Sequence, residues 1–366
     1  MTHHTIRPVP DVLVIGGGLI GLACAVAAAE RGWSVRIVGT VLPGAASLAA
    51  AGLLAPSIES SDGPAHAFAI AARDRYPSYI AWLRDRTGID VPLSRRGILQ
   101  LAVNAAGIRG LKRSMGADAR WIDAQELSTL EPALSHGLGA VFHEHDGWVD
   151  NEVLFSALRT FVETHPRIEL TEDRIVQVGL AADASAVGAS GARYVAGKLV
   201  LAAGAWSSAI SGLPRALPIE PVRGQMLAYS AAPVSRAVYG PTGYVVPRAD
   251  GRTLVGATME RAGFDATTTA EGITKLERTG GEILPSLTQL KPSQAWAGIR
   301  PISADLQPIL SADADDPRLV YATGHSRNGV LMTPLTADCV AAILADDIAP
   351  ADLSAFAADR FSATPR

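Results

Sequence analysis

The hydrophobic pattern near the N-terminus passes from a short apolar run to glycines and then to a longer apolar segment. Val12 to Ile15 are four consecutive apolar residues, which predict a buried strand. Gly16, Gly17 and Gly18 follow, and a helical apolar period begins at Leu19. This order is typical of a dinucleotide diphosphate site, because glycines let the backbone approach the phosphates and the helix N-terminus attracts anions.

Further along the chain, apolar patterns predict more strands and helices. Val35 to Val38 reads as the second strand of a βαβ unit. Residues 42–56 are small and apolar, which predicts a loop that approaches a flat ligand closely. The other predicted elements are helices at 66–86, from Asp150-Asn151 onward, at 269–284 and at 336–344, and strands at 199–207, 222–229, 244–247, 253–258, 294–301 and 318–323.

These elements predict an α/β (α+β) chain with two interleaved domains. A Rossmann-like nucleotide-binding domain is expected from residues 1–84, 146–214 and 296–366. A substrate-binding domain built on an antiparallel sheet is expected from residues 85–145 and 215–295, where Asp250-Gly251 predicts a hairpin turn.

Composition removes several classes of function. The net charge is −4 with a pI near 6.1 and no basic run, which argues against a nucleic-acid partner. No apolar run reaches the length of a membrane span, so we expect a cytoplasmic protein that does not bind a membrane. Cys24 and Cys339 are interpreted as buried thiols of a reducing compartment. The cluster of His143, His145 and Asp146 is interpreted as a polar strand end, and no metal site is expected.

Three residues are candidates for binding a substrate, and each has a simpler alternative. Arg300 ends an apolar segment and could hold a carboxylate with two parallel hydrogen bonds; the alternative is an internal salt bridge. Arg327 precedes the last helix and could face an anion, or it is a solvated loop residue. Tyr244 could donate to the same carboxylate, or it is a half-buried strand aromatic. No nucleophile, metal or acid–base pair follows from spacing, so any reactive centre is expected to be a cofactor.

Six motifs occur together in one order, from Asp11 to about Leu344. Together they resemble the D-amino-acid-oxidase-type flavoproteins, and within them the glycine oxidases of bacterial thiamine biosynthesis. The motifs are the glycine turn, A-A-A-G-L-L at 49–54, Y-V-V-P-R at 244–248, V-G-A-T-M-E at 255–260, W-A-G-I-R-P at 296–301 and G-H-S-R-N-G at 324–329.

The resemblance implies noncovalent FAD and a small amine substrate. It implies hydride transfer from the substrate Cα to flavin N5, hydrolysis of the imine to glyoxylate, and reduction of O₂ to H₂O₂. The implied substrate-binding residues are Arg300, Tyr244, Arg327, Met259, Thr242 and Leu53. The implied FAD-binding residues are Gly16, Gly18, Leu19, Ile20, Gly21, Thr40, Ser47, Ala50, Ala51, Gly52, Leu53, Leu54, Val176, Ala203, Gly204, Trp206, Arg300, His325, Arg327, Asn328, Gly329, Val330 and Leu331.

The chain departs from the family pattern at three positions. The acidic residue expected after the second strand is Gly39, which leaves Thr40 as the candidate for the ribose contact. Thr242 stands where the family has a histidine, and Ser326 where it has a bulky aromatic residue. These smaller residues predict a roomier pocket that accepts N-substituted glycines such as N-carboxymethyl amines.

Other functions stay open at this point. Within the same chemistry they are D-amino-acid oxidation and sarcosine oxidation, although covalent flavin attachment in sarcosine oxidases uses a cysteine that Cys24 and Cys339 do not match in position. A relative that acts on modified tRNA would need a basic surface. From different classes come a nicotinamide-dependent dehydrogenase and a nucleotide-binding protein without activity. Relatives often form homotetramers, so the resemblance also implies a homo-oligomer.

Overall fold

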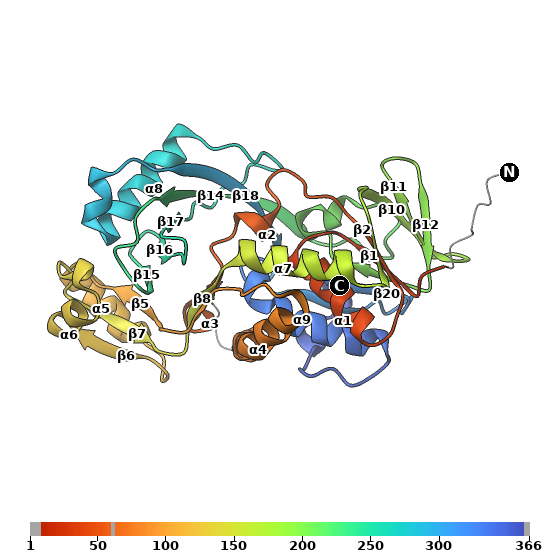
Figure 1. Cartoon of the computed structure of the whole chain (residues 1–366), viewed down its shortest axis with the longest axis horizontal. Coiled ribbons are helices and arrows are strands. Elements are labelled where there is room, and N and C mark those ends of the chain that lie inside the picture. The colour runs from red at the N-terminus through yellow and green to blue at the C-terminus, as the bar shows by residue number, and fades with distance from the viewer. Residues whose placement is uncertain (1–8, 60–62, 362–366) are drawn as a thin grey trace, which may run out of the picture. The chain divides into compact units, whose positions relative to one another are not determined.

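The computed structural model describes residues 9–59 and 63–361 (Figure 1). The chain divides into two compact units. Unit 1 comprises Met1–Leu42, Ser156–Glu220 and Pro301–Arg366, and unit 2 comprises Pro43–Phe155 and Pro221–Arg300. Within the described part of the chain, no helix combines the length and the hydropathy that crossing a membrane requires.

The division differs from the expected domains in one long segment and three short ones. Residues 43–84, 146–155 and 296–300 fall in unit 2, and residues 215–220 fall in unit 1. Strand pairing explains the largest difference. Strand β3 (Leu53–Leu54) pairs with β8 (Gly147–Val149), which also pairs with β4 (Leu93–Ser94), so these segments form one small sheet inside unit 2.

Unit 1 is built on a six-stranded sheet whose strands come from distant parts of the chain (Figure 1). Five neighbouring strands are parallel, and β19 at the edge is antiparallel to β20. The order is β19 (Ile309–Ala312), β20 (Leu319–Thr323), β13 (Lys198–Leu201), β1 (Val12–Ile15), β2 (Val35–Val38) and β9 (Ile168–Thr171). The predicted α/β fold class is confirmed, and the strand after the glycine-turn helix has the predicted bounds.

Both faces of this sheet are covered, which explains the continuous apolar run of β1. Leu13 and Ile15 join a core with the antiparallel sheet of β10 (Ile175–Gly179), β11 (Ala184–Gly188) and β12 (Arg193–Ala196). Val12 and Val14 alternate to the other face and are also buried. Helices α1 (Leu19–Glu30) and α9 (Gly329–Leu344) pack on each other and on strands of the sheet, and each carries one of the two buried cysteines.

Unit 2 contains an eight-stranded, mostly antiparallel sheet as well as the small β3–β8–β4 sheet. Strands β15 and β5 of this sheet pair in parallel. The order is β18 (Gln294–Ser303), β14 (Ile219–Tyr229), β17 (Thr253–Gly256), β16 (Tyr244–Pro247), β15 (Ala237–Tyr239), β5 (Ile98–Leu101), β7 (Gly139–His143) and β6 (Arg120–Asp123).

The two faces of the eight-stranded sheet have different partners. Leu227, Val245 and Val255 share a core with residues of helix α8 (Ala270–Ile283). Their strand neighbours Met226 and Tyr244 face the other side of the sheet. They lie in a cluster with Ala51, Leu53, Ala55 and Ile58. The other helices are α2 (Ala46–Ala49), α3 (Pro56–Glu59), α4 (Pro64–Thr87), α5 (Ala105–Ser114), α6 (Ala124–Leu130) and α7 (Asn151–Thr164).

Four element predictions need correction. The segment 42–56 is not a plain loop, because α2, β3 and the start of α3 lie in it. The last helix begins at Gly329 rather than near 336, and Pro334 is accommodated inside it because the surrounding residues are packed in the core. The strand predicted at 253–258 ends at Gly256, and the strand predicted at 199–207 ends at Leu201, because residues 204–209 form a 3-10 helix.

Candidate active site

The glycine turn of unit 1 fits an anion. Gly16 has a φ of +118°, and a Cβ there would lie 2.4 Å from the Ala202 carbonyl oxygen. A Cβ at Gly21 would lie 2.0 Å from the Gly16 carbonyl oxygen. Helix α1 starts directly after Gly18, with no side-chain cap and no acidic residue in its first turn. Its N-terminal N–H groups and positive end therefore suit a diphosphate.

The space at the end of β2 explains why residue 39 is glycine and not the expected acidic residue. A Cβ at residue 39 would lie 2.3 Å from the backbone nitrogen of Gly17, so the end of β2 approaches the glycine turn too closely for a side chain without a shift. Thr40, the next residue, is exposed. Its contact with a ribose stays a prediction.

Other expected cofactor residues lie at the same edge of the sheet. Ala203, Gly204 and Trp206 directly follow β13, which is parallel to β1, and Ala202 contacts the glycine turn. Strand β20 is parallel to β13 and leads through residues 324–328 into α9. The carboxyl ends of parallel strands form the edge where open α/β sheets bind ligands. Val176 lies in β10, where its carbonyl accepts a hydrogen bond from the Ser211 N–H.

The residues before α9 are held by polar contacts within unit 1. His325 is buried, and its Nε2 lies 3.1 Å from Thr336 Oγ1. Ser326 has a φ of +52°, and its hydroxyl oxygen accepts a hydrogen bond of 3.2 Å from the Ser303 N–H. The Ser326 side chain is therefore turned toward Ser303, and its size alone does not create the extra room that the sequence predicted. Arg327 is exposed.

Buried histidines make stability depend on pH. Burial lowers the pKa of His325 and of His143 to about 4, from the usual 6.5. Between pH 6.5 and 4 the unfolded chain binds protons that the folded chain does not. The free energy of unfolding is therefore expected to decrease as the pH is lowered through this range. Each histidine contributes a slope of about 1.4 kcal/mol per pH unit.

Urea unfolding across this range at saturating FAD measures the slope. His325→Gln should reduce the slope by about 1.4 kcal/mol per pH unit, the contribution of one histidine. A substitution of the exposed His136 should leave the slope unchanged. An unchanged slope in His325→Gln would show that His325 is already protonated in the fold.

In unit 2, residues 44–49 lie tightly against β18. The Ile299 N–H donates to the Gly44 carbonyl at 2.8 Å, and Trp296 Nε1 donates to the Ala49 carbonyl at 3.0 Å. A Cβ at Gly298 would lie 2.4 Å from Ala49 Cβ. Packing thus requires several of the small residues in this segment. Contact of Ser47, Ala50 and Ala51 with a flavin stays a prediction.

Arg248 anchors the same segment, and sequence reasoning gave it no role beyond its place in a motif. The side chain is fully buried, Nη1 donates to the Val149 carbonyl at 3.0 Å, and Nη2 donates to Asn151 Oδ1 at 2.5 Å. Asn151 Nδ2 in turn donates to the Ser47 carbonyl at 2.8 Å. Gly52 has a φ of +71° and accepts a hydrogen bond from the Val149 N–H. The guanidinium therefore ties the β16–β17 hairpin to both sides of residues 47–52.

Arg248→Met is expected to lower the free energy of unfolding by about 2–4 kcal/mol, because buried acceptors lose a charged donor. Thermal and urea unfolding measure the loss. Arg252 is the matched control on the same hairpin, since its ion pairs with Asp250 and Glu152 are partly exposed. Arg252→Met should cost no more than about 1 kcal/mol. Equal losses in the two variants would contradict the anchoring role of Arg248.

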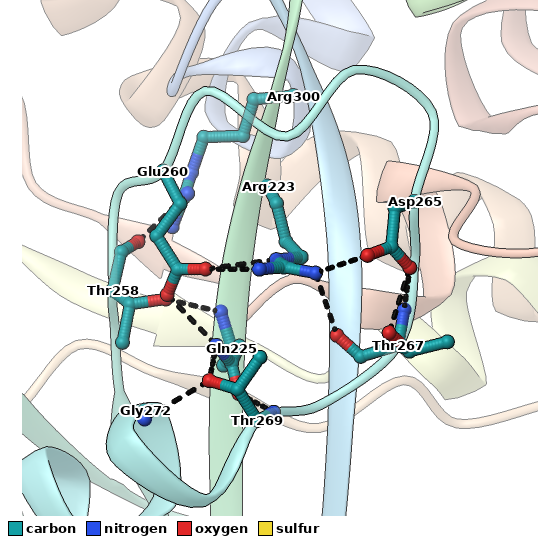
Figure 2. A network of polar contacts seen from close by, with 9 residues as sticks. All are labelled: Arg223, Gln225, Thr258, Glu260, Asp265, Thr267, Thr269, Gly272 and Arg300. Carbon is teal, nitrogen blue, oxygen red and sulfur yellow. Dashed lines mark hydrogen bonds and ion pairs between the residues drawn. The ribbon is translucent and has the colours of Figure 1, made fainter.

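Arg300 lies over a glycine and has a carbonyl as its partner. Its Nη1 donates to the Thr258 carbonyl at 3.1 Å, and a Cβ at Gly224 would lie 2.0 Å from that nitrogen (Figure 2). Among the described residues it forms no ion pair with a carboxylate, so the internal salt bridge considered from the sequence is not found there. The half-buried guanidinium keeps donors that suit a carboxylate ligand.

Tyr244 lies on the same face of the sheet as Arg300. On β18, Arg300 lies four residues after Trp296, so the two side chains share a face of the sheet. Trp296 packs against the cluster that holds Met226 and Tyr244. The Tyr244 hydroxyl lies 3.7 Å from Met226 Sδ, and a Cβ at Gly256 would lie 2.6 Å from the Tyr244 ring. Gly224 and Gly256 thus make room for Arg300 and Tyr244, the two side chains that are predicted to bind the substrate carboxylate. Leu53 packs against the same cluster.

Two other predicted pocket residues are placed differently. The Thr242 hydroxyl lies 2.9 Å from Thr279 Oγ1 and donates to Glu282 Oε2 at 3.0 Å, so it is bound to α8. Met259 is 57% exposed. The histidine cluster has local partners: Asp146 accepts hydrogen bonds from Arg73 and Ser57, and His143 Nε2 lies 2.9 Å from Gln100 Oε1.

These features are typical of a dinucleotide-binding protein. The chain belongs to the FAD dependent oxidoreductase family, which matches residues 11–343. The cofactor is therefore FAD, and the resemblance that the motifs predicted is confirmed.

Three relatives are similar to this chain over nearly its whole length. The chain is 34% identical to "Bifunctional protein ThiO/ThiG" of Synechocystis over 97% of its own length, but it spans only 54% of that relative. Glycine oxidase of Geobacillus kaustophilus has a crystal structure with a TM-score of 0.89, 29% identity and coverage of 96% of this chain and 98% of that one. Iminodiacetate oxidase of Chelativorans sp. BNC1 has a TM-score of 0.87 and 26% identity, with 95% and 98% covered.

Proposed function

We propose that this protein oxidises the amine of glycine or of an N-substituted glycine. The observation that carries the proposal is the placement of Arg300. Its guanidinium lies over Gly224, binds the Thr258 carbonyl and shares a sheet face with Tyr244. Every glycine-type substrate has a carboxylate, and a planar guanidinium is the side chain best suited to hold one in a fixed orientation.

The residues of unit 1 fit FAD. The glycine turn and the N-terminus of α1 would hold the diphosphate without a covalent bond, and Thr40, Val176 and Trp206 would contact the nucleotide. The chemistry that bound FAD would supply is acceptance of a hydride from the substrate carbon and transfer of the electrons to O₂. The overall reaction would consume O₂ and water and release H₂O₂, glyoxylate and ammonia or the freed amine.

The side chains would act by binding and orientation. Arg300 would hold the substrate carboxylate, and the Tyr244 hydroxyl would donate to it. Burial raises the pKa of Glu260, but hydrogen bonds from Thr258 and Arg223 outweigh this and keep the pKa below its usual value. His325 is neutral because of its low pKa. Neither residue suits a base at neutral pH, so we propose that the amine reacts in its neutral form and that orientation supplies much of the rate enhancement.

An N-substituent is part of the proposal. Thr242 and Ser326 are smaller than the family residues that the sequence comparison implied, and one solved relative is named for its action on iminodiacetate, an N-carboxymethyl glycine. The hydroxyls of both residues are bound within their own units, so these two substitutions alone do not create the extra room, and the relative named for iminodiacetate is the observation that supports an N-substituent.

Anaerobic titration of the purified protein tests the function. We expect a yellow protein whose visible flavin absorbance is bleached by glycine, sarcosine or iminodiacetate, and which releases its flavin on acid denaturation. Bleaching by glycine alone would refute the N-substituted substrates, and bleaching only by D-alanine would favour D-amino-acid oxidation. A colourless protein after expression with ample riboflavin, or reduction by NADH in place of amines, would refute the proposal.

A further inference from the structure

Arg223 is the buried centre of a polar network in unit 2 whose acidic members are partly exposed (Figure 2). Its side chain is 9% exposed, and its Nε and Nη2 contact Glu260 Oε2 at 2.8 and 2.6 Å. Its Nη1 donates to Asp265 Oδ2 at 2.7 Å and to the Thr267 carbonyl at 3.2 Å. The backbones of Arg223 and Glu260 also exchange two hydrogen bonds, of 2.8 and 2.9 Å. One guanidinium thus fixes residues 260–267 against β14.

Gln225 completes this network from the same side of β14. Its Nε2 donates to Glu260 Oε1 at 2.8 Å and to Thr269 Oγ1 at 3.0 Å, and its Oε1 accepts from the Thr269 N–H at 2.8 Å. The Gln225 N–H donates to Thr258 Oγ1 at 2.8 Å. Both oxygens of Glu260 therefore have partners, and Thr258 is held to β14.

Arg300 lies on the opposite face of the same strand. Side chains alternate along a strand, so Arg223 and Gln225 point to one face and residue 224 points to the other. The guanidinium of Arg300 lies where a Gly224 side chain would be, and its Nη1 binds the Thr258 carbonyl. The two backbone contacts of Arg300 are thus Gly224, which lies between Arg223 and Gln225, and Thr258, two residues before Glu260.

We propose that Arg223, Gln225 and Glu260 form a clamp that positions Arg300 for the carboxylate of the substrate. The clamp fixes the distance between the Gly224 backbone and the Thr258 carbonyl, and these two groups determine where the guanidinium lies. Its members are positioning residues, since they act through Arg300 and from the far side of the strand. The inference rests on the proposed role of Arg300 in binding a carboxylate.

The test compares clamp variants in two backgrounds. Arg223→Met should raise the dissociation constant of acetate, measured from the perturbed flavin spectrum of the holoenzyme, by about tenfold. The KM for the amine that bleaches the flavin should rise by a similar factor, with kcat changed by less than about threefold. In the Arg300→Lys background the same substitution should have no further effect, because the group through which it acts is already changed. Glu260→Gln keeps one acceptor oxygen, which can still bind Arg223, and loses the acceptor for Gln225 Nε2, so it should have a smaller effect.

A matched buried pair elsewhere in unit 2 provides the control. Arg236 binds Glu131 at 2.9 Å, and its side chain and that of Glu131 are 17% and 4% exposed. Arg236→Met should leave acetate binding and KM unchanged. If Arg223→Met does not fold, Arg223→Lys keeps the charge and carries the same comparison.

The inference is wrong if Arg223→Met leaves acetate binding unchanged, or if its effect is equally large in the Arg300→Lys background. Acetate binding needs no turnover, so failure of the proposed amine oxidation would be visible separately, as a flavin that no amine bleaches while acetate still binds.

Discussion

Replacing Arg300 with methionine is expected to lower kcat/KM for the amine substrate by roughly 10²- to 10³-fold, because a carboxylate would lose a charged partner in a partly buried site. Thr258 is buried and its carbonyl loses this donor, so the free energy of unfolding should also fall, by about 1–3 kcal/mol. Steady-state oxygen consumption and urea unfolding measure the two effects. Arg278 on α8 is a suitable control, since it is 68% exposed and its pair with Glu282 is 3.8 Å long. A loss of less than about threefold in Arg300→Met would remove Arg300 from the substrate site.

Gly224→Ala tests the same site without removing a charge. The added Cβ would displace the guanidinium of Arg300, which is the flexible end of a side chain, so the protein should fold while the KM rises. Gly110→Ala is the control, because a Cβ at that position in α5 meets no atom within 4 Å. An unchanged KM in Gly224→Ala would show that Arg300 binds substrate equally well from a different position.

Gly21→Ala is expected to abolish stable FAD binding, with a loss in affinity of at least about 10²-fold. The Cβ would lie 2.0 Å from the Gly16 carbonyl oxygen, which is a backbone atom of the turn itself, so the turn and the start of α1 must move apart. The ratio of visible to ultraviolet absorbance after purification, followed by titration of the apoprotein with FAD, measures the loss.

Gly17→Ala is the matched control for this prediction. A Cβ at Gly17 would lie 3.6 Å from the Gly39 carbonyl carbon, an ordinary contact, and Gly17 has no positive φ. It should keep its flavin. Equal flavin content in Gly21→Ala and Gly17→Ala would mean that the close packing of Gly21 on Gly16 does not matter for the cofactor.

Much of the fold could be predicted because its signals are local. Val12–Ile15 and the helix from Leu19 were predicted with the observed bounds, since apolar runs and glycines are sufficient to indicate them. Strand β9 and the β10–β12 sheet were not predicted, because short strands with polar positions such as Glu169, Gln177 and Arg193 lack a clear apolar period. Sheet partners and unit boundaries depend on contacts between residues far apart in the chain.

The candidate site shows the same limit. Arg300 and Tyr244 were singled out from their surroundings and motifs, and the structure places them on one face of a sheet, over Gly224 and Gly256. Arg223 and Arg248 gave no functional signal in the sequence, because their roles depend on partners such as Glu260 and Asn151, 37 and 97 positions away. Thr242 and Ser326 were read as smaller substitutes, but only the structure shows where their hydroxyls are bound.

The sequence by itself determined the family, the cofactor and the glycine turn that fits its diphosphate. These follow from ordered motifs and from the chemistry of single residue types, which need no knowledge of neighbours in space. The tertiary structure decided why residue 39 is glycine, what holds residues 47–52 and which groups position Arg300. Each of these is a contact between distant segments, where the available space and the hydrogen-bond partners are set by the fold and not by the local sequence.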